Sequence, residues 1–362
     1  MQLFDKENEV NTGRQWAFDF TKAMAILFMV LVHTFIYVYG EENMDEGFQY
    51  RLNNIYGGVL AAPAFMLCMG VGVAYSRRTD GRTMALRGLK LILAGYLLNA
   101  VRSLPQFLLW LGGYGEGHHD WAIEEFNLFD ILQFAGFAFL LLALLRALRA
   151  SAGVILLVSL AMSVFGTFVR SVDMGSPWLN MLCYPFIGIH VGNIWTSFPL
   201  ANWFIFVATG YWIGKLIRRC NDLNRLYALA TPVAAFVFTA GMIYLSRREK
   251  GMFGDESDDL FYFLTPFDAL VCIAGTITMS GIGHFLMPHE PKVVYEEVKK
   301  VSNDVTRIYL VHWLFVAYLV GGVLHGIFNL PLNDFVTLFI GLAIMVVSVW
   351  LARRKPFSGI KI

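Results

Sequence analysis

The residue best placed for chemistry is His33, which lies inside a long apolar run. Asp19 and Lys22 stand where that run begins. In a helix, eleven steps of about 100° bring His33 to within roughly 20° of Lys22, about 16 Å further along the axis. Asp19 can form an ion pair with Lys22 at a spacing of three residues. Ionisable groups inside a membrane are costly and usually mark a site or pathway, so we expect a function for His33. The alternative is a packing histidine hydrogen-bonded to a neighbouring helix.

Asp268 is the second unusual residue, because it stands about five residues into a later apolar run. That run enters the membrane from the side on which the first run ends, so the depth of Asp268 matches that of His33. A carboxylate there could orient the imidazole and stabilise its protonated form, as a general base often requires. The alternative is a structural ion pair with Arg102 or another residue on the same side.

Four more polar residues are expected on this side. Asn99 and Arg102 end the third apolar run, and Asp130 and Gln133 begin the fourth. Arg102 could stabilise an oxyanion or hold an acceptor substrate. For each of the four, a plain interfacial position explains the residue equally well.

Two further groups complete the candidates. His312 and Tyr309 lie one turn apart in the ninth run, on its cytoplasmic half, where they could line a vestibule with Lys22. Hydrogen bonding between helices is the alternative. The adjacent pair His118 and His119 lacks a third ligand at suitable spacing, so we expect a surface or substrate contact there and no metal.

Composition identifies the class of protein. The chain has 362 residues, of which 57% are hydrophobic and 15% charged, and its mean hydropathy is +0.57. A soluble domain of this length would carry much more charge. The basic residues lie scattered in short segments, which gives no nucleic-acid signal. Four separated cysteines form no disulfide or metal pattern. We therefore expect one all-α domain over residues 1–362, a polytopic membrane helix bundle.

The apolar runs predict about ten transmembrane helices. They cover residues 18–39, 55–75, 84–104, 129–148, 152–171, 201–218, 226–246, 263–285, 305–328 and 333–352. Basic residues gather in the segments 77–82, 146–149, 215–225, 292–300 and 353–361, whereas acidic residues gather in 41–46, 116–125 and 255–259. The positive-inside rule then places both termini in the cytoplasm, with residues 247–250 as a basic exception outside. Residues 1–15 would be a short cytoplasmic segment, and 286–304 a cytoplasmic amphipathic connection.

Two outer connections are long. Residues 105–126 and 173–200 contain more aromatic residues and glycines than plain linkers do. Long ordered loops often cover binding sites, so these two could cover a pocket that opens outward. Interfacial anchoring by their aromatic side chains is the alternative.

The distribution of polar residues permits two active functions. A base and a carboxylate on the outer side, with cations on the inner side, suit a reaction between a cytosolic anionic donor and an outer acceptor. They also suit a proton-coupled transporter or flippase with His33, Asp268 and His312 as its relay. No half-to-half repeat typical of such transporters is evident. A membrane scaffold without activity would leave the buried charges unexplained.

The first run carries a resemblance to a known family. The spacing Lys22-x10-His33 resembles the arginine-x10-histidine motif in the first span of the acyltransferase-3 family. Arg14, Asp19 and the stretch from Lys22 to Val30 resemble the related heparan-α-glucosaminide N-acetyltransferase family. Lysine in place of the usual arginine keeps the charge and loses the planar fork.

Four later stretches agree with this resemblance in the same order. They are Ala62–Gly70, Phe129–Gly136, Phe198–Trp203 continuing to Gly210–Lys215, and Ile308–Trp313 with its Tyr-Leu-x-His pattern. Asn202 replaces the second proline before Trp203, and Cys68-Met69-Gly70 lacks the serine that often precedes the glycine. The matches run from residue 14 to about 315, which is most of the chain.

The resemblance implies transmembrane acyl transfer. Acetyl-CoA or another acyl-CoA would be the co-substrate, with Lys22, Arg14, His312 and Tyr309 as its contacts. A hydroxyl or amine of a sugar or glycan would enter from outside and meet Asn99, Arg102, Asp130 and Gln133. His33, assisted by Asp268, would act as a base or as an acyl-accepting nucleophile.

The same resemblance sets the expected surroundings of the protein. A multi-pass protein of this kind belongs in the bacterial cytoplasmic membrane, among membrane lipids and without nucleic acid or metal. Related proteins often form homodimers, but no surface in the sequence identifies such an interface.

Overall fold

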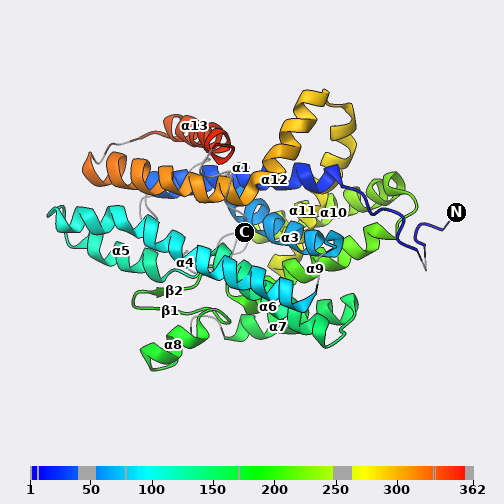
Figure 1. The fold of residues 1–362 in the computed structure, drawn as a ribbon, viewed down its shortest axis with the longest axis horizontal. Coiled ribbons are helices and arrows are strands. Elements are labelled where there is room, and N and C mark those ends of the chain that lie inside the picture. Colours follow the sequence, from blue (N-terminus) through cyan, green and yellow to red (C-terminus); the bar gives the residue numbers. More distant parts are fainter. Residues whose placement is uncertain are drawn as a thin grey trace.

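The computed structural model describes residues 2–5, 8–39, 54–77, 80–169, 172–247, 263–328, 330 and 332–354. It is an all-α bundle whose described part includes one two-stranded sheet (Figure 1). The elements are α1 Trp16–Tyr39, η2 Asn54–Ala61, α3 Ala62–Tyr75, α4 Gly81–Leu111, α5 Gly117–Asn127, α6 Ile131–Ala147, α7 Ala152–Phe168, α8 Pro177–Cys183, β1 His190–Val191, β2 Ile194–Trp195, α9 Leu200–Arg218, α10 Leu223–Ser246, α11 Pro266–Leu286, η4 Met287–His289, α12 Lys292–Leu314, η5 Phe315–Ile327 and α13 Asp334–Ala352.

The predicted membrane bundle is confirmed. Among the described residues, eight helices are long and apolar enough to cross a membrane, and the shorter apolar helices α6 and α7 occupy the fourth and fifth predicted spans. The location of both termini in the cytoplasm stays a prediction. The acidic segments 41–46 and 255–259 lie outside the described residues, as do parts of the segments 77–82, 247–250 and 353–361.

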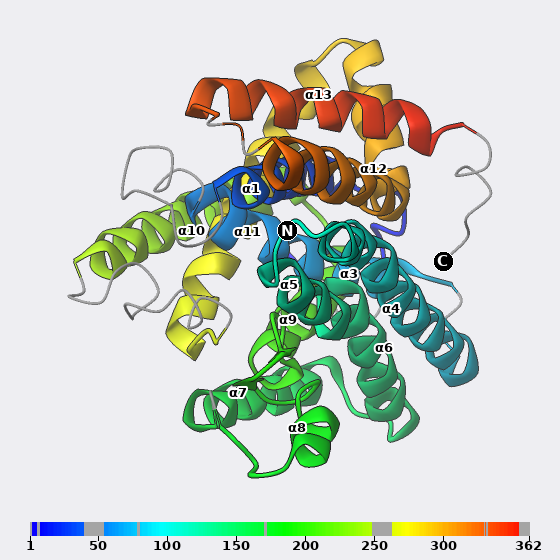
Figure 2. The ribbon, with the colours of Figure 1, turned by 90° about the vertical axis from the view of Figure 1, so that its left-hand side faces the viewer.

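α1, α4 and α12 run along the long axis, with α5 at the end opposite the N-terminus (Figure 1), whereas α13 runs across that axis (Figure 2). Seen from that end, α13 lies above α12, and α7 and α8 form the opposite edge (Figure 2). α10 and α11 make one flank, and α4 and α6 make the other. α1 packs against α11, α12 and α13, so the helix that carries His33 is enclosed by elements from the end of the chain.

Two glycines let α3 and α9 approach closely. A Cβ atom added at Gly70 would lie 2.0 Å from the carbonyl oxygen of Val207, and one added at Gly210 would lie 1.9 Å from that of Leu67. Each glycine thus accommodates the backbone of the other helix, as small residues do in membrane helix contacts. This contact explains why glycine stands in the two stretches that resemble the family.

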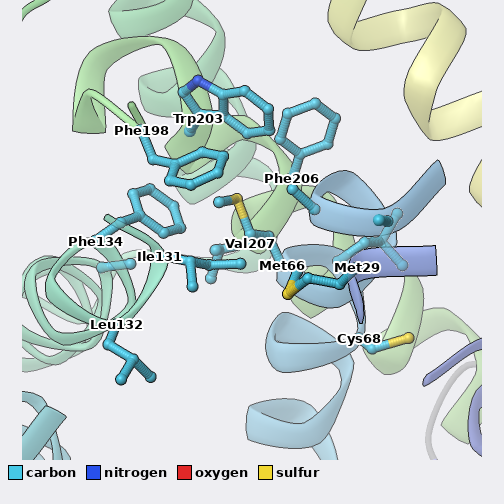
Figure 3. Close-up of a cluster of buried hydrophobic side chains, with 14 of the residues drawn as sticks. Met29, Met66, Cys68, Ile131, Leu132, Phe134, Phe198, Trp203, Phe206 and Val207 are labelled. Carbon is cyan, nitrogen blue, oxygen red and sulfur yellow. The ribbon is translucent and has the colours of Figure 1, made fainter. Parts of the chain in front are cut away.

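The core beside this contact is formed by α3, α6 and α9 (Figure 3). Trp203 and Phe206 of α9 are fully buried, with Phe134 of α6 and Met66 of α3 around them. The ring centroids of Phe198 and Trp203 are 4.8 Å apart, in an edge-to-face arrangement. Close packing of this kind fixes α6 against α9 and α3.

α4 continues beyond the predicted end at residue 104. Pro105 lacks the N–H that would bond to the carbonyl oxygen of Val101, four residues earlier. Tyr318 of η5 donates its hydroxyl to that oxygen at 2.9 Å, so the orphaned acceptor is satisfied and the helix runs on to Leu111. The expected loop 105–126 is therefore mostly helical: it consists of the end of α4 and of α5, which packs back along α4.

The second outer connection is also ordered. It contains α8 and the hairpin of β1 and β2, in which His190 pairs with Trp195. Residues 292–303, expected as part of an amphipathic connection, form the first half of α12, which continues to Leu314 and then into the π-helical turns of η5. Their cytoplasmic location stays a prediction.

Candidate active site

Two histidines meet at the centre of the site. His33 Nδ1 of α1 lies 2.9 Å from His312 Nε2 of α12, and the two rings stack with centroids 5.2 Å apart. His312 is fully buried, whereas His33 remains partly exposed. His312 was expected on the other half of the membrane, in a vestibule with Lys22. The structure places it at the depth of His33 because α12 begins at Lys292, well before the predicted start of the span at residue 305.

The surroundings of His312 favour one tautomer. Its buried Nδ1 faces the carbonyls of Ile308 and Tyr309 in its own helix, without a hydrogen bond of good geometry. Carbonyl oxygens only accept, so they favour the proton on Nδ1 and leave Nε2 as an acceptor. His33 then donates from Nδ1 to His312. The lone pair of His33 Nε2, for which the described residues supply no hydrogen-bond partner, is left for chemistry.

Trp313 packs against His33. Its indole stacks on the His33 ring with centroids 4.3 Å apart. The guanidinium carbon of Arg102, in α4, lies 4.7 Å from the centroid of the same indole. Trp313 is the last residue but one before the π-helical segment η5. Such wide turns often occur at functional sites.

A buried charge cluster lies beside the histidines. Arg102 pairs with Asp130 Oδ2 at 2.8 Å and with Glu125 Oε2 at 2.6 Å, and its side chain is only 1% exposed. One guanidinium thus faces two carboxylates. Such a group stays charged only where its partners compensate for lost hydration.

Two tyrosines join this cluster to the histidine helices. Tyr309 donates to Asp130 Oδ2 at 3.0 Å, and its ring centroid lies 6.4 Å from that of His33. Tyr37, one turn after His33 on α1, donates to Glu125. These contacts link α1, α4, α5, α12 and the N-cap of α6 at the site, which holds the two imidazoles in place.

The β-hairpin positions Asp130. Phe129, the residue before it, donates its backbone N–H to Trp195 at 2.9 Å and accepts from Ser197 at 3.0 Å. The Asp130 side chain also caps α6 by accepting from the N–H of Ile131 at 2.7 Å. The second outer connection thus fixes the start of α6 and the position of the Asp130 carboxylate.

The start of α1 holds a second cluster of charges. Asp19 pairs with Arg14 at 2.6 Å and with Lys22 at 3.8 Å, which confirms the expected pair between Asp19 and Lys22. Ser302 of α12 donates to the same carboxylate at 2.6 Å. Asp19 is nearly buried, whereas Lys22 keeps 31% of its side chain exposed and can meet a ligand.

A cavity of about 320 Å³ extends from this charged start of α1. Lys22 and Arg87 supply its cations, and Tyr309 connects it to the histidine pair. Its other walls are mainly apolar and come from α3, α4, α6 and α12; among them are Phe65, Cys68, Leu91, Leu132 and Phe139. A cavity of this size with a few convergent polar groups is typical of small-molecule sites.

Several predicted contacts have other partners. Asn99 donates to the carbonyls of Leu128 and Phe126 at 2.6 and 3.1 Å, and Gln133 reaches the carbonyl of Leu128 at 3.4 Å. Asp268 forms a capping box with Thr265 at the start of α11. Its role beside His33 stays a prediction; the hydrogen bond that His33 Nδ1 donates goes to His312.

Sequence reasoning missed three residues of the site. Tyr37 follows His33 by four residues, a spacing that places the two on one helical face and could have identified it. Trp313 directly follows His312. Glu125 was grouped with the acidic outer segment, and no local pattern distinguishes it from Glu124.

The pKa values in α5, outside the membrane spans, reflect this packing. Burial, and then the charge of His325, hold the pKa of the His118 imidazole below its usual 6.5. Burial, followed by the nearby Asp120 and Glu125, raises the pKa of the Glu124 carboxyl. Both shifts favour the neutral form, as expected for groups tucked against a helix bundle.

Comparison with known proteins agrees with this architecture. The family model described as an acyltransferase domain, that of the acyltransferase-3 family, matches residues 15–354. A comparison with curated proteins gives no match. The matched region contains the histidine pair, the charge cluster and the cavity, and the chain belongs to the acyltransferase-3 family of membrane acyltransferases.

Proposed function

We propose that this acyltransferase moves an acetyl or other short acyl group from cytosolic acyl-CoA to a hydroxyl or amine of a sugar on the outer side of the bacterial cytoplasmic membrane. The observation that carries the proposal is the position of His33. One of its nitrogens is held by His312, the other is left for a substrate, and a cavity with cations at its charged end leads toward the pair.

The donor side follows from the cavity. Lys22 and Arg87 would meet the negative charge of the CoA phosphates, while the apolar walls suit the pantetheine arm. Tyr309 stands where the cavity approaches the histidines, so the thioester would lie beside its ring. Arg14 is tied to Asp19 and would act by holding Lys22 in place through that shared carboxylate.

The chemistry requires one proton to move twice. The acceptor O–H or N–H gives its proton to His33 Nε2 while its oxygen or nitrogen attacks the thioester carbon. The C–S bond then breaks, and the leaving CoA thiolate takes the proton back from His33. His312 would hold the ring in this geometry through its acceptor Nε2.

The test uses purified protein in liposomes with labelled acetyl-CoA and a panel of amino sugars and glycans. Wild type should transfer label to an acceptor, and His33→Ala should not. His284→Ala is the matched control, because His284 is a histidine of α11 whose Nε2 bonds to Asn224. Label found on the protein without an acceptor would indicate an acyl-histidine intermediate instead of direct transfer.

Donor binding can be measured separately from transfer. Labelled acetyl-CoA should bind the purified protein saturably in equilibrium dialysis without an acceptor, because the cavity offers Lys22 and Arg87 to its phosphates. Lys22→Ala should weaken this binding. Absence of binding at millimolar acetyl-CoA would contradict the donor site and favour the transporter alternative.

A further inference from the structure

Gln106 of α4 presents a buried donor with no partner among the described residues. Its side chain is 2% exposed, and its Oε1 bonds to His118 Nδ1 at 2.7 Å. Nε2 has no hydrogen-bond partner in the described part of the chain. An unpaired buried amide is costly, about 1–3 kcal/mol, so a group that completes it is expected.

This donor lies close to the histidine centre. A Cβ atom at Gly321 would be 3.6 Å from Gln106 Nε2 and 2.7 Å from Cδ1 of Tyr37. The amide and the Tyr37 ring therefore border the same glycine of η5. Gln106 follows Arg102 by one helical turn, and Tyr37 follows His33 by one turn, so each lies about 6 Å further along its helix.

Aromatic rings of Tyr37, Trp121 and His325 cluster near Gln106. The Trp121 ring lies 5.6 Å from that of Tyr37 and 6.3 Å from that of His325. Tyr37 in turn lies 5.6 Å from Trp313, on which His33 stacks. Trp121 and His325 are partly exposed, so a ligand can reach them.

The residues first expected to hold an acceptor are less suited to it. The Asn99 amide already donates to two backbone carbonyls. The Asp130 carboxylate already accepts hydrogen bonds from Arg102, Tyr309 and the backbone N–H of Ile131. One turn beyond Arg102, by contrast, the Gln106 amide has an unused donor. His118 bonds to that amide, and His325 lies beside the Trp121 indole.

We propose that Gln106, Trp121, His118 and His325 form the acceptor subsite and take a neutral, hydroxyl-rich sugar ring. The C–H face of the ring would stack on Trp121, and Gln106 Nε2 would donate to a ring hydroxyl. The imidazoles would bond to further hydroxyls. One helical turn is the scale of a single pyranose, so the next hydroxyl would reach His33. The assignment rests on the proposed function, because it needs an outer sugar acceptor.

The test measures sugar binding without transfer. Equilibrium dialysis in a His33→Ala background would use labelled methyl β-glucoside, N-acetylglucosamine and a maltotriose as probes. Gln106→Leu and Trp121→Ala should each raise Kd for a bound probe about tenfold or more. Trp110→Ala and His119→Ala are matched controls from the same region, since Trp110 packs on His119 with centroids 4.7 Å apart, and they should leave Kd unchanged.

Folding is checked by saturable binding of labelled acetyl-CoA, which all variants should retain. Should Trp121→Ala misfold, Trp121→Phe replaces it and should give a smaller loss of affinity. Failure of all probes to bind, or equal affinity in Gln106→Leu and the controls, would overturn the subsite. Gln106→Leu and Trp121→Ala are also made with His33 intact; transfer with the acceptor KM of wild type in both would leave the proposed function standing and remove only this assignment.

Discussion

His33 Nδ1 and His312 Nε2 lie 2.9 Å apart although 279 residues separate them in the chain. The contact joins α1 to α12 beside Tyr309, which lines the cavity. It leaves one nitrogen of His33 for a substrate and gives the other a fixed partner. His312 therefore fixes the ring orientation and the tautomer of His33, as a second group often does for a histidine that acts as a base.

Replacement of His312 should slow chemistry while donor binding persists. His312→Ala removes the acceptor for His33 Nδ1, so the His33 ring loses its orientation and its tautomer preference. We expect kcat to fall about 10²–10⁴-fold, the range for general acid–base groups, with little change in the Kd for acetyl-CoA. His312→Gln keeps an acceptor and should recover part of the rate. Equal rates for the two variants would argue against a positioning role.

The charge cluster should be sensitive to the loss of its single cation. Arg102→Leu leaves Glu125 and Asp130 buried without compensation, and the expected cost is about 3–5 kcal/mol of unfolding free energy. Thermal unfolding in detergent measures it. The triple variant with Glu125→Gln and Asp130→Asn should regain much of the lost stability. A triple variant less stable than Arg102→Leu alone would contradict the charge explanation.

The contact between α3 and α9 should tolerate no side chain at its glycines. Gly70→Ala would drive a methyl group into the backbone of α9 and should cost about 1–3 kcal/mol or more. Gly72→Ala is the matched control, because nothing lies within 4 Å of a Cβ atom there. Comparison of the two melting temperatures checks the prediction, and equal values would refute it.

Acid should destabilise the region around α5. The lowered pKa of His118 means that the folded state prefers the neutral imidazole. Its contribution to stability is therefore present above pH 6.5, the usual value, and is lost as the pH falls through the lower folded-state pKa. His118→Gln should show a smaller drop in melting temperature between pH 7 and pH 5 than wild type. His119→Gln should show the same drop as wild type.

Local pattern predicted much of this protein. Apolar runs of bilayer length indicate a polytopic helix bundle, because backbone groups in lipid must be paired within each span. The pair of Asp19 and Lys22 follows from helical spacing alone. The spacing of Lys22 and His33, with the later motifs, also sufficed to indicate the family.

Tertiary structure alone decided which groups meet His33. The predicted spans put His312 on the opposite half of the membrane from His33, but α12 starts thirteen residues before its predicted span, and the fold brings the two histidines into contact. Glu125 reaches Arg102 only because α5 folds back along α4, a path set by packing and by the hydrogen bond from Tyr318 beside Pro105. Periodicity relates residues within one helix. Contacts between helices depend on packing partners that lie far apart in the chain, so only the folded bundle reveals them.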